Sequence, residues 1–492
     1  MTVLETRDQI SWLDDVDESG MVINPHHELF GKSLAGVELH YPSASGSTVG
    51  SDRIVHLAVR GCGPKRIVID RADPITMWGA ILGKIDLEVR GSPTTSVDRG
   101  KLERLGIEPE IAEYLARAAE LIGTDEFVPV DHVQIAGVSY KTITETGLEL
   151  RRHFASQFRF RAAHVTINPA GMDLEDWQAM GVPEDFARKQ EEVIELYLRM
   201  GATPTITCTP YLTGNMPPPF TDAFLSESSV VAYANSVLGI RTNRESGLSS
   251  LLYAIAGYGP RYGLHIPENR NPRVEVAVTC DLEGTVDFGC LGYRLGEVVR
   301  GRIPLITGLR SRPTLEELKV LSASGAASGS VDLFHIDRFT PEAASHLISL
   351  DRVEERLVVD RESLDSAKAR LNTGSPERLD LVTFGCPHAS LLEVKEIASL
   401  LEKKHVRKEV QLWVCTSRAV KDLSARLGYV ATIERAGGHV VADTCMVVAP
   451  IERMGPQTTG TNSGKAAKYL PRFCRQNVVF DSAEAIVSKI VS

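Results

Sequence analysis

The sequence contains no run of about 18 apolar residues, the length that a membrane-spanning helix needs. Its opening segment, MTVLETRDQISWLDD, is acidic where a secretory signal peptide is basic and then apolar, so we expect a cytoplasmic protein. An excess of basic residues is also missing. The formal net charge of -10 argues against a general surface for nucleic acid or for anionic membranes.

Paired cysteine motifs are absent as well. None of the eight cysteines belongs to a CxxC motif, and they lie far apart in the chain: Cys62, Cys208, Cys280, Cys290, Cys386, Cys415, Cys445 and Cys474. In a cytosolic chain this spacing favours free thiols, or metal ligands that come together only in the fold. It argues against a disulfide framework.

The composition is that of a soluble multidomain protein. The chain has 492 residues, 43% of them hydrophobic and 24% charged, which is enough for two to four domains. Residues 1–95 predict a small β-rich domain, because strand-like runs separated by Gly and Pro lie at 37–43, 53–59, 66–72 and 84–91. We interpret residues 92–107 as a linker and residues 96–492 as a large α/β domain.

Periodic patterns support the α/β class for the large domain. Apolar residues at helical spacing predict amphipathic helices at 110–123 and 183–201, the second ending at Gly201. From about residue 330, strand-like and helix-like segments alternate, which predicts right-handed βαβ units in a parallel sheet. Thr166 and Asn168 end a strand-like run, the place where ligands collect in such sheets.

The least ordinary stretch is TCTPYLTGNMPPP at 207–219, followed by ESSVVAYANSVLGIRTNR at 227–244. The first segment holds Cys208 in a polar loop rich in proline. The second predicts a helix of small residues that begins at Glu227 and Ser228 and ends in Arg, Thr and Asn. Such polar residues indicate a functional site more than a packed core.

Three cysteines stand in similar settings at expected strand ends. Cys386 is expected to end a strand, with Pro387 as the first residue of a helix whose dipole favours the thiolate. Cys208 in TCTPY and Cys445 in DTCMV each stand beside a hydroxyl residue. The three predict one metal centre with three protein sulfurs and an open position. Cys415 is a fourth candidate, and we interpret Cys62, Cys280, Cys290 and Cys474 as structural.

Other readings of the reactive segments stay open. A nucleophilic cysteine enzyme would use His388 or His132 as the base for Cys386. SASGSTVGSDR at 43–53 predicts either a solvated turn or a loop that holds a reactive hydroxyl at Ser47. GTNSGKAAKY at 460–469 lacks the leading Gly of a phosphate loop and the Ser or Thr after its Lys, but its Ser, Asn and Lys can bind a carboxylate.

Taken together, these motifs resemble the aconitase X family of the aconitase superfamily. The matching segments follow the order of the family over nearly the whole chain: HHELFGKSLAG, SGSTVGS, TINP, TCTPY, ESSVVAYANSVLGIRTNR, GLHIPENR, FGCPH, DTCMV and TNSGKAAKYLP. The resemblance implies a swivel domain, fused here to the N-terminus, that closes over a large α/β domain. It also implies a cofactor, either an iron–sulfur cluster of the 2Fe–2S or 4Fe–4S type or a mononuclear iron.

The resemblance also implies roles for particular residues. Cys208, Cys386 and Cys445 resemble the metal ligands of the family, and Ser47 resembles its catalytic base. The family often has Arg just before the Gly-Ser pair of this loop, whereas this chain has Ser45, which leaves the substrate contacts of the loop open. The expected substrate-binding residues are Lys141, Thr166, Asn168, Arg241, Arg244, Ser463 and Lys465.

Two activities are implied by the resemblance, both with a small-molecule substrate. One is dehydration of cis-3-hydroxy-L-proline to Δ1-pyrroline-2-carboxylate, and the other is dehydration of mevalonate 5-phosphate. Members of the second type usually split the two domains into separate chains, so the fusion favours the first. An iron-responsive RNA-binding protein, known elsewhere in the superfamily, is a third reading that the acidic balance argues against.

Overall fold

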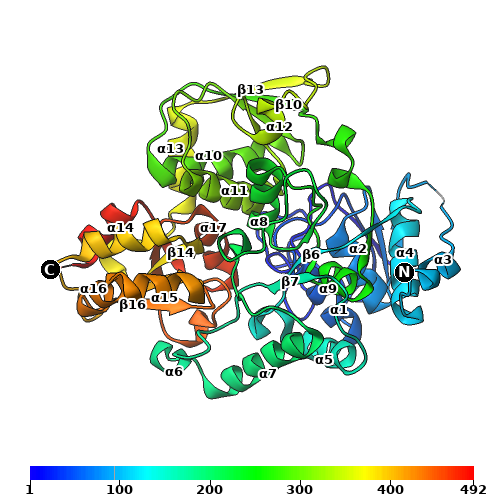
Figure 1. The fold of residues 1–492 in the computed structure, drawn as a ribbon, viewed down its shortest axis with the longest axis horizontal. Helices are drawn as coiled ribbons and strands as arrows, with labels where there is room; N and C mark the ends of the chain where they lie inside the picture. Colours follow the sequence, from blue (N-terminus) through cyan, green and yellow to red (C-terminus); the bar gives the residue numbers. More distant parts are fainter. Residues whose placement is uncertain (94, 492) are drawn as a thin grey trace.

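A computed structural model of the protein describes residues 1–93 and 95–491. It is an α/β structure with parallel sheets, as the sequence predicts, and its two termini lie at opposite ends of the long axis (Figure 1). Within the described ranges, no helix is both long and apolar enough to cross a lipid bilayer.

The N-terminal part is a four-stranded parallel sheet in the order β1-β2-β3-β4 with two helices. The strand predicted at 53–59 is wrong, because this segment belongs to a helix. Ile54, Val55 and Leu57 are buried there between neighbouring helices, and a short apolar run does not distinguish a strand from a buried helix. The elements are β1 (Val3–Glu5), β2 (Glu38–Tyr41), α1 (Gly50–Val59), β3 (Arg66–Ile69), α2 (Pro74–Gly83) and β4 (Asp86–Val89).

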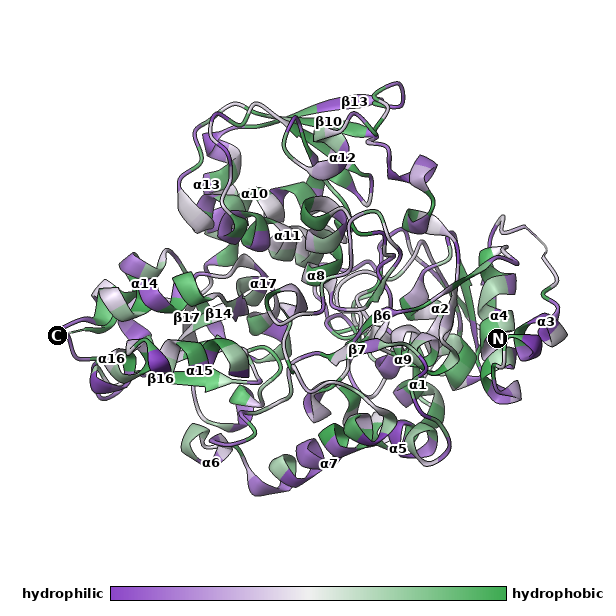
Figure 2. Ribbon diagram, viewed as in Figure 1, coloured by the Kyte–Doolittle hydropathy of each residue, from purple (hydrophilic) through white to green (hydrophobic). Residues whose placement is uncertain are grey.

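The next segment joins this sheet to the rest of the chain. The linker predicted at 92–107 contains a short helix, and its residue 94 lies outside the described part of the chain. Both predicted amphipathic helices are confirmed, as α4 (Pro109–Ile122) and α7 (Glu184–Met200). Gly201, with a positive φ of 108°, caps the C-terminus of α7. Hydrophilic and hydrophobic residues both line α7 in Figure 2, as expected of a helix with one buried face.

Residues 99–260 hold a three-stranded parallel sheet in the order β7-β6-β8 and an antiparallel pair, β5 and β9. The helices are α3 (Arg99–Arg104), α4 (Pro109–Ile122), α5 (Tyr140–Gln157), α6 (Trp177–Met180), α7 (Glu184–Met200), α8 (Ser228–Tyr233) and α9 (Gly247–Ala256), and a π-helical turn (Ala234–Leu238) follows α8. The strands are β5 (Phe127–Pro129), β6 (His132–Ile135), β7 (His164–Ile167), β8 (Phe224–Leu225) and β9 (Tyr258–Pro260).

A third parallel sheet, in the order β12-β11-β10-β13, lies within residues 274–371 together with its helices. Its helices α10 and α11 pack closely against each other, and α11 also contacts α8 and a helix of the C-terminal part. The elements are β10 (Val274–Val278), α10 (Gly284–Val299), β11 (Pro304–Thr307), α11 (Leu315–Gly329), β12 (His335–Ile336), α12 (Pro341–Ala344), β13 (Glu355–Val359) and α13 (Arg361–Leu371).

The C-terminal part confirms the predicted βαβ alternation, with five parallel strands in the order β16-β15-β14-β17-β18. One detail of the prediction is wrong: Cys386 and Pro387 both lie within β14, and α14 begins only at Leu391 after the cap of Ser390. The dipole of α14 therefore does not act on Cys386. The elements are β14 (Leu381–Ala389), α14 (Leu391–Leu401), β15 (Gln411–Thr416), α15 (Arg418–Arg426), α16 (Tyr429–Arg435), β16 (His439–Ala442), β17 (Thr458–Thr461), α17 (Gly464–Phe473), β18 (Asn477–Phe480) and α18 (Ala483–Ile490).

The N-terminal part is joined to the rest by charged contacts. Asp52 of α1 pairs with Arg151 of α5, and both side chains are 0% exposed. Arg472 of α17 lies 3.4 Å from the carboxylates of Asp14 and Asp15. These contacts join α1 and the segment between β1 and β2 to helices α5 and α17.

Candidate active site

A cavity of about 80 Å³ lies where the N-terminal part meets β14 and the segments that follow β6, β7 and β16. It brings together residues that are remote in the sequence. Its lining contains Ser47 from the N-terminal part, the three cysteines expected to bind metal, and both members of one ion pair. The polar and sulfur-containing lining residues are Ser47, Thr48, Ser139, Thr142, Asn168, Cys208, Glu227, Ser228, Cys386, Cys445, Lys465 and Tyr469.

The three cysteines come from different segments and meet at this cavity. Cys386 lies in β14, and Cys445 follows β16. Cys208 comes after α7, at the end of a stretch whose amides donate hydrogen bonds to carbonyls of β7. Each is buried, with 6–7% of its surface exposed. The thiols of Cys386 and Cys445 are hydrogen-bonded to each other, and the amide of His388 donates to the sulfur of Cys208 at 3.2 Å.

The pKa values of the two paired thiols shift in opposite directions. The hydrogen bond from Cys386 lowers the pKa of Cys445 to about 7, while the same bond and burial raise the pKa of Cys386. Burial, followed by the charge of Glu227, raises the pKa of Cys208 to about 12. Of the three, Cys445 is therefore the thiol that most readily becomes the thiolate that binds metal.

This donor set fits an iron centre by its chemistry. Three sulfurs line one cavity, one of them is ready to ionise, and a cation lies beside them. They are not already gathered around a point: in the described residues, no group of three or more His, Cys, Asp or Glu side chains is arranged to hold a metal ion. Cys415, in β15, does not line the cavity, so it is not part of this set.

The loop before α1 places Ser47 in the same cavity. Gly46 takes a positive φ of 70°, and a Cβ at this position would lie 2.0 Å from the hydroxyl of Ser11. The amide of Val49 donates to Ser47 Oγ at 3.4 Å. Of the two readings of this loop, a solvated turn and a held hydroxyl, the geometry matches the second.

Lys465 and Glu227 form the ion pair in the lining. Lys465 Nζ contacts the Glu227 carboxylate and lies 3.4 Å from Ser228 Oγ and 3.3 Å from Ser229 Oγ. Burial lowers the pKa of Lys465, but the charge of Glu227 together with smaller effects of Cys386, Tyr469 and Cys208 raises it more, so the net shift is upward. The lysine therefore stays an ammonium ion, and the pair adds no net charge to the cavity.

The structure brings some of the expected substrate-binding residues to the cavity and keeps others away. Asn168 lines it and accepts a hydrogen bond from Gln134 at 3.2 Å. Ser463 does not line it, but caps α17 and donates to the carbonyl of Cys386. Thr166 does not line the cavity, and its hydroxyl accepts a hydrogen bond from the side-chain amide of Asn215 at 2.7 Å.

Three cationic residues from the same set lie outside the lining. Lys141 donates to Glu452 at 2.7 Å and to Cys474 at 3.3 Å. The main chain of Arg241 forms an isolated parallel β-bridge with that of Asp222. Arg244 contacts the carbonyl of Gly46, the hydroxyl of Ser330 and, at 3.8 Å, the carboxylate of Asp332.

Histidine does not serve as a base for Cys386. His388 is 0% exposed, and its ring nitrogens bind Thr207 Oγ1 and the Thr444 carbonyl, each at 2.9 Å. Burial lowers its pKa to about 4, so the ring is neutral and fixed. His132 binds Asn215 at 2.9 Å and lies outside the cavity lining. A cysteine–histidine nucleophile is therefore not formed.

Sequence reasoning assigned no role to two further lining residues. The sequence indicates Glu227 only as the start of a helix, although a carboxylate in a segment of small polar residues is a signal of a partner for a cation. Tyr469 lies one turn after Lys465 in α17, and burial raises its pKa to about 12. Both residues belong to the segments on which the family resemblance rests.

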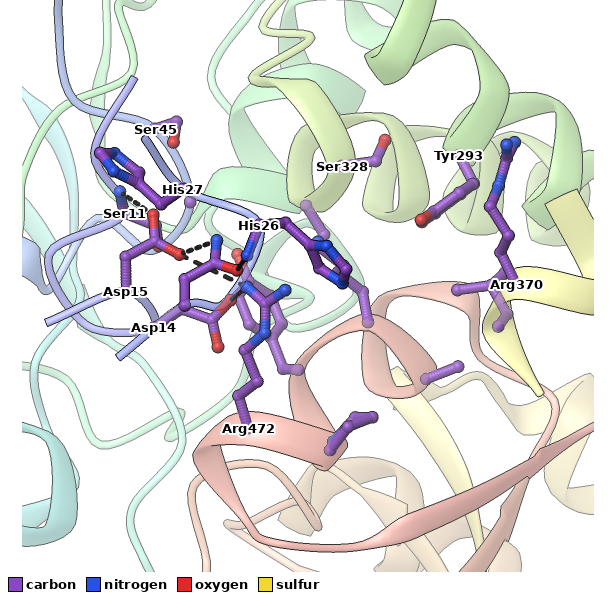
Figure 3. Close-up of a pocket in the computed structure, with 18 of the residues that line it drawn as sticks. Ser11, Asp14, Asp15, His26, His27, Ser45, Tyr293, Ser328, Arg370 and Arg472 are labelled. Atoms are coloured by element: carbon purple, nitrogen blue, oxygen red, sulfur yellow. Dashed lines mark hydrogen bonds and ion pairs between the residues drawn. The ribbon is translucent and has the colours of Figure 1, made fainter. Parts of the chain in front are cut away.

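A larger cleft of about 610 Å³ adjoins the cavity and shares Tyr469 with it. Figure 3 shows Asp14 and Asp15 from the N-terminal part facing Arg472, with Tyr293 and Arg370 on the opposite side. Burial raises the pKa of Asp14 to about 6, even though Arg472 and Lys468 lower it. The cleft holds none of the three cysteines, all of which line the smaller cavity.

This fold and this cavity define a multidomain α/β enzyme. Four family models match the chain in sequence order: the aconitase X swivel domain at 2–105, the first domain at 99–268, the second domain at 272–369 and the third domain at 379–492. The chain belongs to the aconitase X family, and it is a dehydratase of that family.

Relatives with two different activities are similar to this chain. The phosphomevalonate dehydratase large subunit of Methanothermobacter thermautotrophicus is 44% identical over 75% of this chain and 91% of the relative. The cis-3-hydroxy-L-proline dehydratase of Pseudomonas aeruginosa is 31% identical over 98% of this chain and 93% of the relative. The N-terminal part is similar to a phosphomevalonate dehydratase small subunit from Methanothrix thermoacetophila, 47% identical over 17% of this chain and 62% of the relative.

A solved relative has the same fold. The holo-form of Thermococcus kodakaraensis aconitase X superimposes with a TM-score of 0.71 at 38% identity, covering 78% of this chain and 95% of that one. Its holo-form implies that this relative binds a cofactor. The resemblance seen in the sequence is thus confirmed at the level of family, fold and reaction class.

Proposed function

We propose that this chain dehydrates cis-3-hydroxy-L-proline to Δ1-pyrroline-2-carboxylate. The observation that carries the proposal is the Glu227–Lys465 pair in a small, buried cavity. Hydroxyproline is a zwitterion, with one carboxylate for the lysine and one ring ammonium for the glutamate. An ion pair without net charge suits a substrate without net charge, because burying an unpaired charge is costly. The full-length similarity to a single-chain hydroxyproline dehydratase supports the same choice.

The reaction removes the proton on Cα and expels hydroxide from Cβ. Ser47 takes the proton, Lys465 holds the substrate carboxylate, and Asn168 and Ser228 bind its remaining polar groups. Serine is a weak base, so its alkoxide needs donors. The amide of Val49 is one, and the ammonium of Lys465 lines the same cavity. The product of elimination is a cyclic enamine, which tautomerises to the imine.

Cys208, Cys386 and Cys445 are the residues that would hold the iron or iron–sulfur centre. Such a centre, when bound, supplies a Lewis acid that makes the substrate hydroxyl a better leaving group. The residues of the chain then have three tasks: to bind the zwitterion, to orient Cα toward Ser47 and to exclude water.

Mevalonate 5-phosphate is the second candidate substrate. It is favoured by the 44% identity to a phosphomevalonate dehydratase large subunit and the 47% identity of the N-terminal part to a small subunit. A phosphate would need cations beyond the Glu227–Lys465 pair. The adjoining cleft has Arg370, Lys468 and Arg472, where the distal end of a longer substrate can lie (Figure 3).

A side-by-side assay separates the two candidates. We expect anaerobically purified protein to turn over cis-3-hydroxy-L-proline, with kcat/KM at least tenfold above that for mevalonate 5-phosphate. The two kcat/KM values are measured from the rate at which the pyrroline forms and the rate at which the dehydrated phosphomevalonate forms. The control is Ser47→Ala, which should lose activity on either substrate by about 10²-fold or more. The reverse preference would replace our first candidate by the second.

The metal assignment has its own test. Cys386→Ala is expected to lose most of the iron and the visible absorbance of the anaerobic protein, because it removes one of three sulfurs. Cys290→Ala is the matched control, since Cys290 is a buried thiol of α10 outside the cavity. Full iron content in Cys386→Ala would remove this residue from the ligand set.

A further inference from the structure

Arg244 joins three parts of the chain around the loop that carries Ser47. Its guanidinium donates to the carbonyl oxygen of Gly46 and to the hydroxyl of Ser330, and the carboxylate of Asp332 lies 3.8 Å from its Nε. Arg244 comes from the segment after α8, Gly46 from the N-terminal part, and Ser330 and Asp332 from the loop after α11. The arginine is only 7% exposed.

The contact falls on the residue immediately before Ser47. Gly46 is held on its other side by Ser11, whose hydroxyl occupies the place of a side chain. The carbonyl of Thr48, the residue after Ser47, accepts a hydrogen bond from the amide of Gly247 at 3.3 Å. The main chain on both sides of Ser47 is therefore bound to the large domain, while the Ser47 side chain faces the cavity.

We propose that Arg244 is a positioning residue that holds the Ser47 loop closed over the catalytic cavity. The proposal rests on the role of Ser47 as the base. It differs from the role expected from the sequence, in which Arg244 binds substrate, because Arg244 does not line the cavity and its donors are directed to Gly46 and Ser330. Arg244 therefore acts on the reaction through the main chain of the loop.

The chemistry of the side chain suits this task. A planar guanidinium can donate to Gly46 and Ser330 at the same time, whereas a lysine ammonium is a compact point charge on a flexible chain. The residues that bind substrate in our proposal form no hydrogen bond or ion pair with Arg244; they are Asn168, Glu227, Ser228 and Lys465. Loss of Arg244 should thus displace the base and lower kcat, with a much smaller effect on KM.

The surroundings of Arg244 also make chemical rescue possible. A cleft of about 370 Å³ is lined by Arg244 together with Asn243, Tyr262 and Arg302. A free guanidinium ion can enter this cleft and donate to the two oxygens that the truncated side chain leaves behind. Arg302 lines the same cleft but binds Glu355 and the Val299 carbonyl, with no hydrogen bond to the loop.

The test compares Arg244→Ala with the matched control Arg302→Ala. Steady-state kinetics are measured on whichever of the two candidate substrates the wild type converts. We expect Arg244→Ala to lower kcat by about 10²-fold. Guanidinium chloride, far below unfolding concentrations, should raise the kcat of this variant at least tenfold. Urea and sodium chloride at matched concentrations should restore nothing. Arg302→Ala should behave as wild type.

Hydrogen exchange of the loop gives a readout that does not depend on substrate. In Arg244→Ala, the amides of residues 44–50 should exchange at least tenfold faster, and guanidinium should slow them again. If Arg244→Ala does not fold, Arg244→Lys and Ser330→Ala replace it, with the same direction and smaller size. Wild-type kcat, unchanged loop exchange, or a raised KM with unchanged kcat would each overturn the proposal.

Failure of the proposed base is distinguishable from failure of the positioning role. Activity in Ser47→Ala would refute the proposed base, whatever Arg244→Ala does. An inactive Ser47→Ala beside a fully active Arg244→Ala would leave the base in place and refute only the role of Arg244.

Discussion

Gly46 is the residue where the loop before α1 tolerates change least. Its φ of 70° disfavours any side chain, and an added Cβ would lie 2.0 Å from Ser11 Oγ. We therefore expect Gly46→Ala to shift Ser47 and lower kcat by about 10²-fold, since a displacement of 1 Å has that effect on catalysis. The measurement is kcat with substrate at saturation.

The control for this change is Gly61→Ala. Gly61 also has a φ of 70°, but no atom lies within 4 Å of its missing Cβ. Gly61→Ala introduces the same backbone strain far from the cavity, so this variant should keep the activity of the wild type. Equal kcat values for the two variants would mean that the contact with Ser11 does not fix the loop.

At this scale the sequence identified residues better than it identified their partners. Ser47, Asn168, Lys465 and the three cysteines line one cavity, and each lies in a short motif that the family shares. The binding and catalytic roles assigned to them stay predictions. Arg244 and Lys141 lie elsewhere, because their partners, Gly46 and Glu452, are 198 and 311 positions away. No local pattern in a sequence reveals such a partner.

The start of helix α9 contains a buried carboxyl group that makes stability depend on pH. Glu245 is 0% exposed, and burial raises its pKa to about 7, although hydrogen bonds from Ser249 and Asn243 lower it. The folded state therefore keeps a proton that the unfolded state releases near its usual pKa. The stability from this group is present at low pH and is lost as pH rises through about 7.

Glu245→Gln should remove this dependence. Between pH 5 and pH 8 the wild type should lose up to about 3 kcal/mol of stability through this group, and the variant should lose correspondingly less. Urea titrations at the two pH values measure the difference. Glu402→Gln, at an exposed carboxylate, is the control; if it matches Glu245→Gln, the buried group is not the cause.

At the scale of elements, periodicity succeeded where one face of an element is exposed. Helix α7 has a clear polar face and differs from the predicted range 183–201 by one residue at each end, and the βαβ units of the C-terminal part occur in the predicted order. Helix α1 was misread as a strand because its run of Ile54, Val55 and Leu57 is buried on several sides. Burial removes the polar positions that would reveal the period.

The whole molecule depends on contacts between its N-terminal part and the rest. Asp52–Arg151, Arg472 with Asp14 and Asp15, and Arg244 with Gly46 all cross that boundary. We expect residues 1–95 and 96–492, produced as two chains, to assemble and elute together with dehydratase activity. The similarity of the N-terminal part to a separate small subunit supports this.

Asp52→Asn in the shorter chain tests which contact dominates. It leaves Arg151 buried without a counter-charge, at a cost of about 3 kcal/mol or more, so the affinity of the two chains should fall by at least 10²-fold. Asp70→Asn is the control, because Asp70 pairs with Arg90 within the N-terminal part. Separate elution of the two unaltered chains would contradict the expected assembly.

The buried pair between α1 and α5 bears on how such enzymes diversify by recombination. A gene that acquires the N-terminal part of a relative inherits one charge of that pair and must already encode the other. Without Asp52, the acceptor protein would contain the buried guanidinium of Arg151 without its counter-charge. Selection would then remove the chimaera because it is unstable, whatever its catalytic activity. The residues at positions 52 and 151 should therefore change together during evolution, even in lineages where the two parts are encoded by separate genes.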